Sequence, residues 1–131
     1  MPEHVHILLR PAAGSTLDVP LRSLKTAVAK RVIARLRESN DPFLDEIRTS
    51  GDAFRFWQKG GGFDRNVRDD GEFCREVRYV HRNPVERELV MNPEDWAWSS
   101  VRWCMGRRDV EVMCDLPPGD PRMWAAWKGY V

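Results

Sequence analysis

The sequence lacks the features that would mark a membrane protein, a disulfide framework or a zinc-binding module. No apolar run approaches the roughly 20 residues that a membrane-spanning helix needs. The three cysteines, Cys74, Cys104 and Cys114, are widely spaced and form no Cys-x-x-Cys pair. Because one is also left over, neither disulfides nor a zinc knuckle are indicated. With no secretory pattern at the N-terminus, we expect a cytoplasmic protein without a membrane partner.

The sequence also has little net charge, +1 at neutral pH, which does not suggest a bulk binder of polyanions. Basic side chains nevertheless gather in two segments, and local basic patches can bind phosphates even when the total charge is balanced. The candidate phosphate-binding side chains are Lys25, Lys30 and Arg31 in the first segment and Arg75, Arg78 and Arg82 in the second. For any one of these charges, a solvated helix face is an equally good interpretation.

A length of 131 residues predicts a single domain. Alternation of apolar residues predicts a strand over 4–10, and apolar spacings of three and four predict an amphipathic helix over 17–38. The pattern of residues 54–58 and 63–67 predicts two strands of a hairpin around a glycine turn. A further helix is expected over 71–82, ended or broken by Pro84.

Two pairs of polar residues stand out for their spacing. On a strand, His4 and His6 project from the same face, so their two imidazoles can close on one metal ion. On a helix, Tyr79 and Asn83 lie one turn apart and also share a face. Each pair also has an ordinary interpretation: two polar residues on the outer face of a strand, and a boundary tyrosine whose hydroxyl reaches water.

Chemistry gives a reason to combine the pairs. A phenol has a pKa of about 10, so a tyrosine needs a nearby positive centre or a base before it can act as a nucleophile. A divalent metal on His4, His6 and Asn83 would polarise a phosphodiester and stabilise the charge of the transition state. Attack by Tyr79 would then give a phosphotyrosine link and a free 3′-hydroxyl.

Four stretches of the sequence together resemble one family, the REP-associated tyrosine transposases. These are single-tyrosine members of the His-hydrophobic-His (HUH) nuclease superfamily. The stretches are MPEHVHILLRP, WQKGGGFDRNVRDDGEF, REVRYVHRNPVERELV and PEDWAWSS. The resemblance covers residues 1–104, which we take as the family-like core, and leaves 105–131 as a C-terminal tail. It matches His4 and His6 to the histidine pair, Tyr79 to the nucleophile and Asn83 to the third metal ligand.

The resemblance implies an α+β fold, a ferredoxin-like antiparallel sheet with helices packed on it. It also implies Mg²⁺ or Mn²⁺ as cofactor and, as partner, single-stranded DNA with a hairpin, typically a repetitive extragenic palindrome; it leaves a homodimer open. Family members usually carry a strand, a helix and a second strand before the turn at which this sequence starts. A sheet without those strands would expose an unpaired edge at 4–9. Three explanations stay open: a misassigned start codon, a truncated remnant, or a partner chain that completes the sheet.

Three functions follow from the sequence. The leading one is a transposase or endonuclease that cleaves and transfers single-stranded DNA through a covalent 5′-phosphotyrosine, with the six basic residues on the DNA. The second is a catalytically inactive, truncated DNA-binding remnant. The third is a metal-dependent hydrolase with a water nucleophile.

Overall fold

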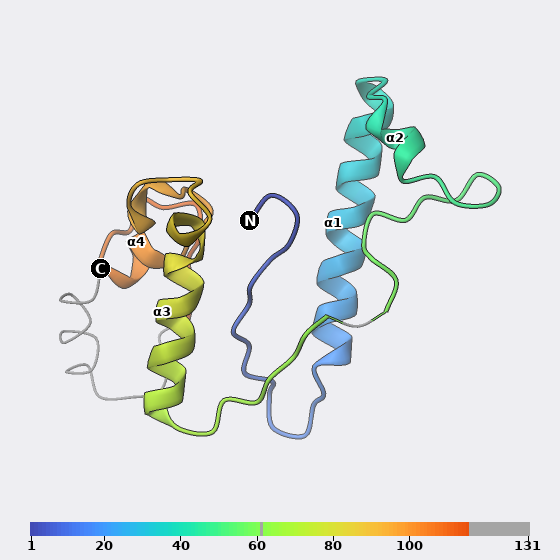
Figure 1. Ribbon diagram of the computed structural model, residues 1–131. Coiled ribbons are helices and arrows are strands. Elements are labelled where there is room, and N and C mark those ends of the chain that lie inside the picture. Colours follow the sequence, from blue (N-terminus) through green and yellow to red (C-terminus); the bar gives the residue numbers. More distant parts are fainter. Residues whose placement is uncertain (61, 116–131) are drawn as a thin grey trace. The chain divides into compact units, whose positions relative to one another are not determined.

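The computed structural model describes residues 1–60 and 62–115, and within them it is helical (Figure 1). The helices are α1 (Asp18–Glu38), α2 (Phe43–Glu46), α3 (Asp70–Glu86) and α4 (Val101–Cys104), with a 3₁₀ turn, η1 (Pro93–Asp95), between the last two. The chain divides into two compact units. We call Met1–Leu8 with the described residues from Arg65 onward the α3 unit, and Leu9–Asp64 the α1 unit. Residues 116–131 of the predicted tail lie outside the described part.

The predicted ferredoxin-like sheet is wrong for the described residues, which contain no strand. Their only β pairing is an isolated antiparallel bridge between Arg48 and Phe54. A strand is stable only when its backbone N–H and C=O groups pair with a neighbour. Residues 4–10 have no such neighbour, because no backbone hydrogen bond of the described chain involves them. The hairpin expected over 54–58 and 63–67 is wrong for the same reason, since neither segment forms a strand.

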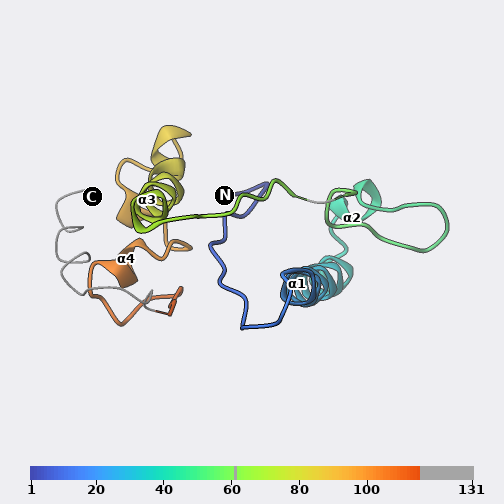
Figure 2. The same cartoon turned by 90° about the horizontal axis from the view of Figure 1, so that it is seen from below.

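Helix α1 confirms the helix predicted over 17–38. Asp18 in its first turn and two arginines in its last turn oppose the helix dipole, and Asn40, with φ of 49°, follows its end. No residue of α1 is buried, although its apolar stripe is present in the sequence. The α1 unit is held instead by polar and aromatic contacts: the Trp57 indole N–H donates to the Lys25 carbonyl oxygen at 2.7 Å. Short α2 lies beside the end of α1 (Figure 2).

Helix α3 is longer than predicted. It begins where the Asp69 side chain accepts a hydrogen bond from the Glu72 backbone N–H at 2.7 Å, a typical N-cap. The prediction that Pro84 ends or breaks it is wrong, because the helix continues to Glu86. Proline's fixed φ suits a helix, and the missing N–H removes only one bond of the ladder. The turn beyond Pro84 is closed by bonds from Arg87 N to Asn83 O (3.1 Å) and from Leu89 N to Pro84 O (2.9 Å).

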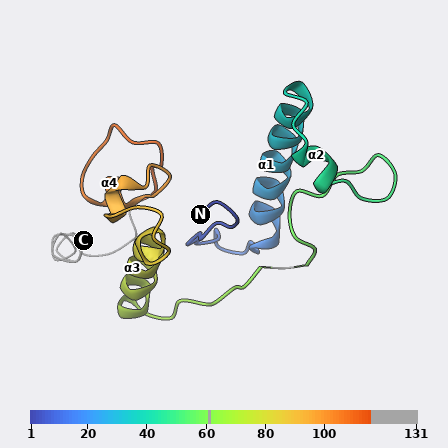
Figure 3. The same ribbon diagram turned by 45° about the horizontal axis from the view of Figure 1, so that its top comes forward.

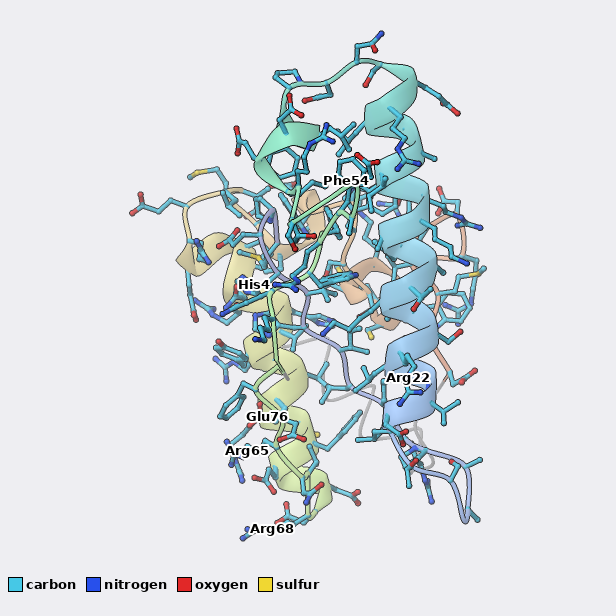
Figure 4. All side chains as sticks on the ribbon, turned by 90° about the vertical axis from the view of Figure 1, so that its right-hand side faces the viewer. His4, Arg22, Phe54, Arg65, Arg68 and Glu76 are labelled. Carbon is cyan, nitrogen blue, oxygen red and sulfur yellow. The ribbon has the colours of Figure 1, made fainter. Side chains whose placement is uncertain are left out.

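The core of the α3 unit is small. Its buried apolar residues are Val77 and Pro84 on α3 and Val101 on α4, and η1 packs against both helices. Figure 3 shows α4 next to the C-terminal half of α3. At this junction the buried side chain of His81 and the half-buried side chain of Ser100 share a hydrogen bond of 2.9 Å between Nε2 and Oγ. At the other end of α3, the guanidinium of Arg65 contacts the carboxylates of Glu72 and Glu76 (Figure 4). Both ends of the helix are thereby fixed.

No helix in the described residues combines the length and the apolar character that crossing a membrane requires.

Candidate active site

The two histidines of the N-terminal segment converge on one point. His4 Nε2 and His6 Nε2 are 3.0 Å apart, and their rings meet edge to face at a centroid distance of 4.7 Å. Two donors at about 2.1 Å from an octahedral ion and at right angles to each other are about 3.0 Å apart. Without an ion, the same approach is satisfied by a hydrogen bond between one protonated and one unprotonated nitrogen. The pair therefore fits adjacent positions on one octahedral metal ion.

Helix α3 places Asn83 next to this pair. Asn83 is 7% exposed. Its side-chain oxygen is fully buried and has no donor at full hydrogen-bonding geometry among the described residues. The carboxamide nevertheless lies close enough to His6 to favour the protonated ring. A buried oxygen acceptor beside His6, whose ring also meets His4, is the kind of group a metal ion would satisfy.

His6 is held mainly as a neutral imidazole. Burial lowers the pKa of His6 below its ordinary value, and the charge of His4 lowers it further, against the opposing effect of Asn83. Only an unprotonated ring nitrogen can bind a metal. At neutral pH His6 is consequently ready to act as a ligand.

Tyr79 lies against His6. Its ring is 5.3 Å from the His6 ring, centroid to centroid, in an edge-to-face arrangement. Tyr79 is 48% exposed, so its hydroxyl is within reach of an extended substrate. The structure thus brings together His4, His6, Tyr79 and Asn83 from two segments that are distant in the sequence. Their chemical roles stay predictions.

Three arginines share the face of α3 that carries Tyr79. At about 100° per residue, Arg75, Arg78, Arg82 and Tyr79 fall within an arc of about 100°. All three arginines are exposed, and Arg82 also pairs with Glu86 at 3.6 Å. This face presents positive charge on the turns before and after the tyrosine.

The other predicted basic residues, Lys25, Lys30 and Arg31, belong to the α1 unit. Lys30 and Arg31 are exposed. Lys25 is half-buried, with its ammonium 5.7 Å from the centre of the Trp57 ring. Lys25 therefore makes a cation–π contact with Trp57, a structural role that the sequence pattern did not indicate.

Sequence reasoning missed two residues next to the histidines. The Glu3 carboxylate lies 3.5 Å from His4 Nδ1 and also contacts the guanidinium of Arg87, at the end of α3. The position of Glu3 directly before His4 was the available signal; nothing in the sequence pointed to Arg87. In the described chain, no three His, Cys, Asp or Glu side chains gather in a way that could hold a metal ion. A metal site here depends on the Asn83 amide as the third ligand.

The comparison with known proteins found a protein that carries the name of the family described under the sequence analysis. Over 113 residues the chain is 27% identical to a protein of Haemophilus influenzae that carries the provisional name REP-associated tyrosine transposase. The match covers 86% of this chain and 58% of that protein, so the chain spans little more than half of its relative. No family model matches the chain, and no solved structure does. A likeness to a transposase over most of the chain is what the comparison establishes.

Proposed function

We propose that the chain is a metal-dependent tyrosine strand transferase that cleaves and rejoins single-stranded DNA beside a hairpin, as a transposase does. One observation carries the proposal: two histidines have converging nitrogens, and one of them, His6, lies against a half-exposed tyrosine and beside an asparagine with a buried side-chain oxygen. The similarity to a protein named as a transposase supports the same function. Mg²⁺ and Mn²⁺, which accept nitrogen and oxygen ligands in octahedral geometry, are the cofactors proposed for His4, His6 and Asn83.

In the proposed reaction the Tyr79 hydroxyl oxygen attacks the phosphorus of a phosphodiester. The bond from phosphorus to the 3′-oxygen breaks, which leaves a 5′-phosphotyrosine and a strand ending in a 3′-hydroxyl. The phenol proton passes to water, which reaches the half-exposed ring, and the leaving oxygen takes a proton from water. Attack by a new 3′-hydroxyl reverses the reaction and joins two strands. The bound ion would supply stabilisation of the negative charge on the phosphate oxygens.

The arginine face of α3 supports DNA as the substrate. Arg75, Arg78 and Arg82 flank Tyr79 at distances of four, one and three residues along the helix, so phosphates on either side of the scissile one meet a guanidinium. Guanidinium groups bind phosphate oxygens in pairs of hydrogen bonds. Such contacts position the strand without reading its sequence. In the α1 unit, exposed Lys30 and Arg31 are further candidates for contacts with DNA phosphates.

The test is covalent capture of the DNA. The protein is incubated with Mn²⁺ and with end-labelled single-stranded DNA that contains a palindrome, and the products are run on a denaturing gel. A slower band that carries both protein and DNA is expected. Tyr79→Phe is the matched control, since it removes only the hydroxyl and keeps the ring against His6; this variant should give no band. His6→Ala should also give none.

The other outcomes identify the alternatives. A native-gel shift with no covalent band from the wild-type protein would indicate a catalytically inactive DNA-binding protein. Cleavage that persists in Tyr79→Phe and disappears in His6→Ala would indicate a hydrolase with a water nucleophile. Either result would overturn the strand-transfer mechanism.

A further inference from the structure

Glu3 connects the candidate metal site to the end of α3. One of its carboxylate oxygens, Oε1, faces His4 Nδ1 at 3.5 Å, and the same oxygen contacts the guanidinium of Arg87. Glu3 is half-exposed, as is Arg87. An exposed pair of this kind contributes little to stability by itself. Its position beside a candidate ligand suggests a different use.

The two nitrogens of His4 face different partners. Nε2 is hydrogen-bonded to His6 Nε2 at 3.0 Å, whereas Nδ1 lies 3.5 Å from the Glu3 carboxylate. A carboxylate only accepts hydrogen bonds, so it favours the form of the ring that carries its proton on Nδ1. In that form the lone pair is on Nε2, the atom that faces the second histidine. A ligating histidine commonly donates its other N–H to a carboxylate, which sets its tautomer and the orientation of its ring.

Arg87 anchors the Glu3 carboxylate to the end of α3. Its backbone N–H caps α3 by donating to the Asn83 carbonyl oxygen at 3.1 Å. The same residue therefore closes the helical turn that carries Asn83 and holds the carboxylate behind His4. The Glu3–Arg87 ion pair therefore connects the N-terminal segment, which carries His4, to the end of α3, which carries Asn83. This connection does not depend on a metal ion.

We infer that Glu3, anchored by Arg87, is a positioning residue that holds His4 in the tautomer presenting Nε2 to a metal ion. The inference rests on the proposed function for the ion, but it also makes a statement about the metal-free protein. In that state His4 should be found with its proton on Nδ1, and neutralising Glu3 should release this preference.

The first measurement is the tautomer of His4 in the metal-free protein, from the ¹⁵N chemical shifts of the imidazole nitrogens above the pH at which the ring is protonated. In the wild-type protein the Nδ1–H form is expected to predominate. In Glu3→Gln the two forms should become mixed, and Glu3→Asp should restore part of the preference. The matched control is Glu86→Gln, which removes another half-exposed carboxylate that pairs with an arginine on the same end of α3. It should leave His4 unchanged.

The second measurement is Mn²⁺ affinity by titration calorimetry. Loss of a carboxylate behind a ligating histidine typically weakens metal binding about 10- to 100-fold. Because Glu3 is half-exposed, we expect about tenfold for Glu3→Gln, a smaller loss for Arg87→Gln and no change for Glu86→Gln.

The two measurements separate the inference from the proposed function. If the wild-type protein binds no Mn²⁺, the metal-dependent function fails while the tautomer data still test Glu3. If the wild-type protein binds Mn²⁺ and Glu3→Gln changes neither affinity nor tautomer, the inference fails and the function stands. A loss of affinity without a tautomer change would mean that Glu3 acts only through its charge, which also overturns the positioning role.

Discussion

Burial of His81 makes the stability of the α3 unit depend on pH. His81 is 4% exposed, and burial lowers the pKa of His81 to about 4 from an ordinary value of 6.5. The folded chain therefore resists protonation of this ring while the unfolded chain accepts it. Between about pH 6.5 and 4 the unfolded state binds more protons, so the free energy of unfolding falls as the pH is lowered.

The size of the effect follows from the two pKa values. One pKa unit is worth about 1.4 kcal/mol, so the full shift corresponds to about 3 kcal/mol, approached as the pH falls to 4 and below. At pH 5, where most carboxylates are still ionised, the loss relative to pH 7 is about 2 kcal/mol. Against a total stability of about 5–15 kcal/mol for a domain, a loss of about 2 kcal/mol is readily measured.

The assay is urea unfolding at pH 7 and pH 5, followed by far-ultraviolet circular dichroism and by tryptophan fluorescence. The difference in the free energy of unfolding between pH 7 and pH 5 should be about 2 kcal/mol smaller in His81→Gln than in the wild-type protein. Ser100→Ala is the control: it removes the hydroxyl hydrogen-bonded to His81 and should cost about 1 kcal/mol at both pH values. An unchanged pH difference in His81→Gln would refute the argument that burial of this ring sets the acid sensitivity.

Two further predictions concern the arginine face of α3 and the chemistry of Cys104. Replacing Arg75, Arg78 and Arg82 together by Gln should make the slope of log affinity for single-stranded DNA against log salt concentration shallower by about 2, about 0.7 for each phosphate that is no longer neutralised. The control Arg107→Gln, which removes a charge paired with Asp109, should leave the slope unchanged. An unchanged slope in the triple variant would contradict the proposed DNA face. Burial, together with the neighbouring Cys114 thiol, raises the pKa of Cys104 to about 12, so iodoacetamide at pH 8 should alkylate this thiol about a thousandfold more slowly in the folded chain than in urea, because only the thiolate reacts. Peptide mass spectrometry reads out the alkylated fraction, and equal rates in the two states would exclude a buried thiol.

The helices could be predicted because their signals are local. The spacing of leucines and valines indicated α1 to within a residue at its start, and the helix predicted over 71–82 lies within α3. The length of α3 was underestimated because the expectation that proline ends a helix considers only the local destabilisation that the proline itself causes. The backbone bonds that Arg87 and Leu89 make beyond Pro84 offset this cost, and the sequence does not reveal them.

The sheet could not be predicted in the same way. Alternation at Val5, Ile7 and Leu9 is real, but it becomes a strand only when another segment supplies the backbone partners. In the described chain these residues are 55%, 38% and 46% exposed, so the apolar face that the pattern indicates is not covered. The sheet expected from the resemblance required backbone hydrogen bonds between segments that are distant in the sequence. The pattern within one segment does not predict such bonds.

The candidate site was easier to predict than the fold because its four residues come in two local pairs. Helical spacing placed Tyr79 and Asn83 on one face of α3. The convergence of His4 and His6 was predicted from a strand that the described chain does not form, yet their Nε2 atoms lie 3.0 Å apart. The contact of one pair with the other is a tertiary fact, and chemistry suggested it before the structure did. Glu3 and Arg87 illustrate the limit: their ion pair joins the N-terminal segment to the end of α3, and no periodicity relates them.

A single helix gives Tyr79 and Asn83 the different surroundings that the proposed chemistry needs. Residues four apart differ by only about 40° around the axis, yet Tyr79 is 48% exposed and Asn83 only 7%. A nucleophile has to meet a polymer strand, so exposure serves Tyr79. A neutral ligand binds best where water does not compete, so burial serves Asn83. His6 lies against both, at the boundary between the exposed arginine face and the core. A shift of α3 by one residue would rotate it by about 100° and would remove both the tyrosine and the amide from His6. The fixed ends of α3, at Asp69 and at Arg87, are therefore as important to the proposed site as its ligands.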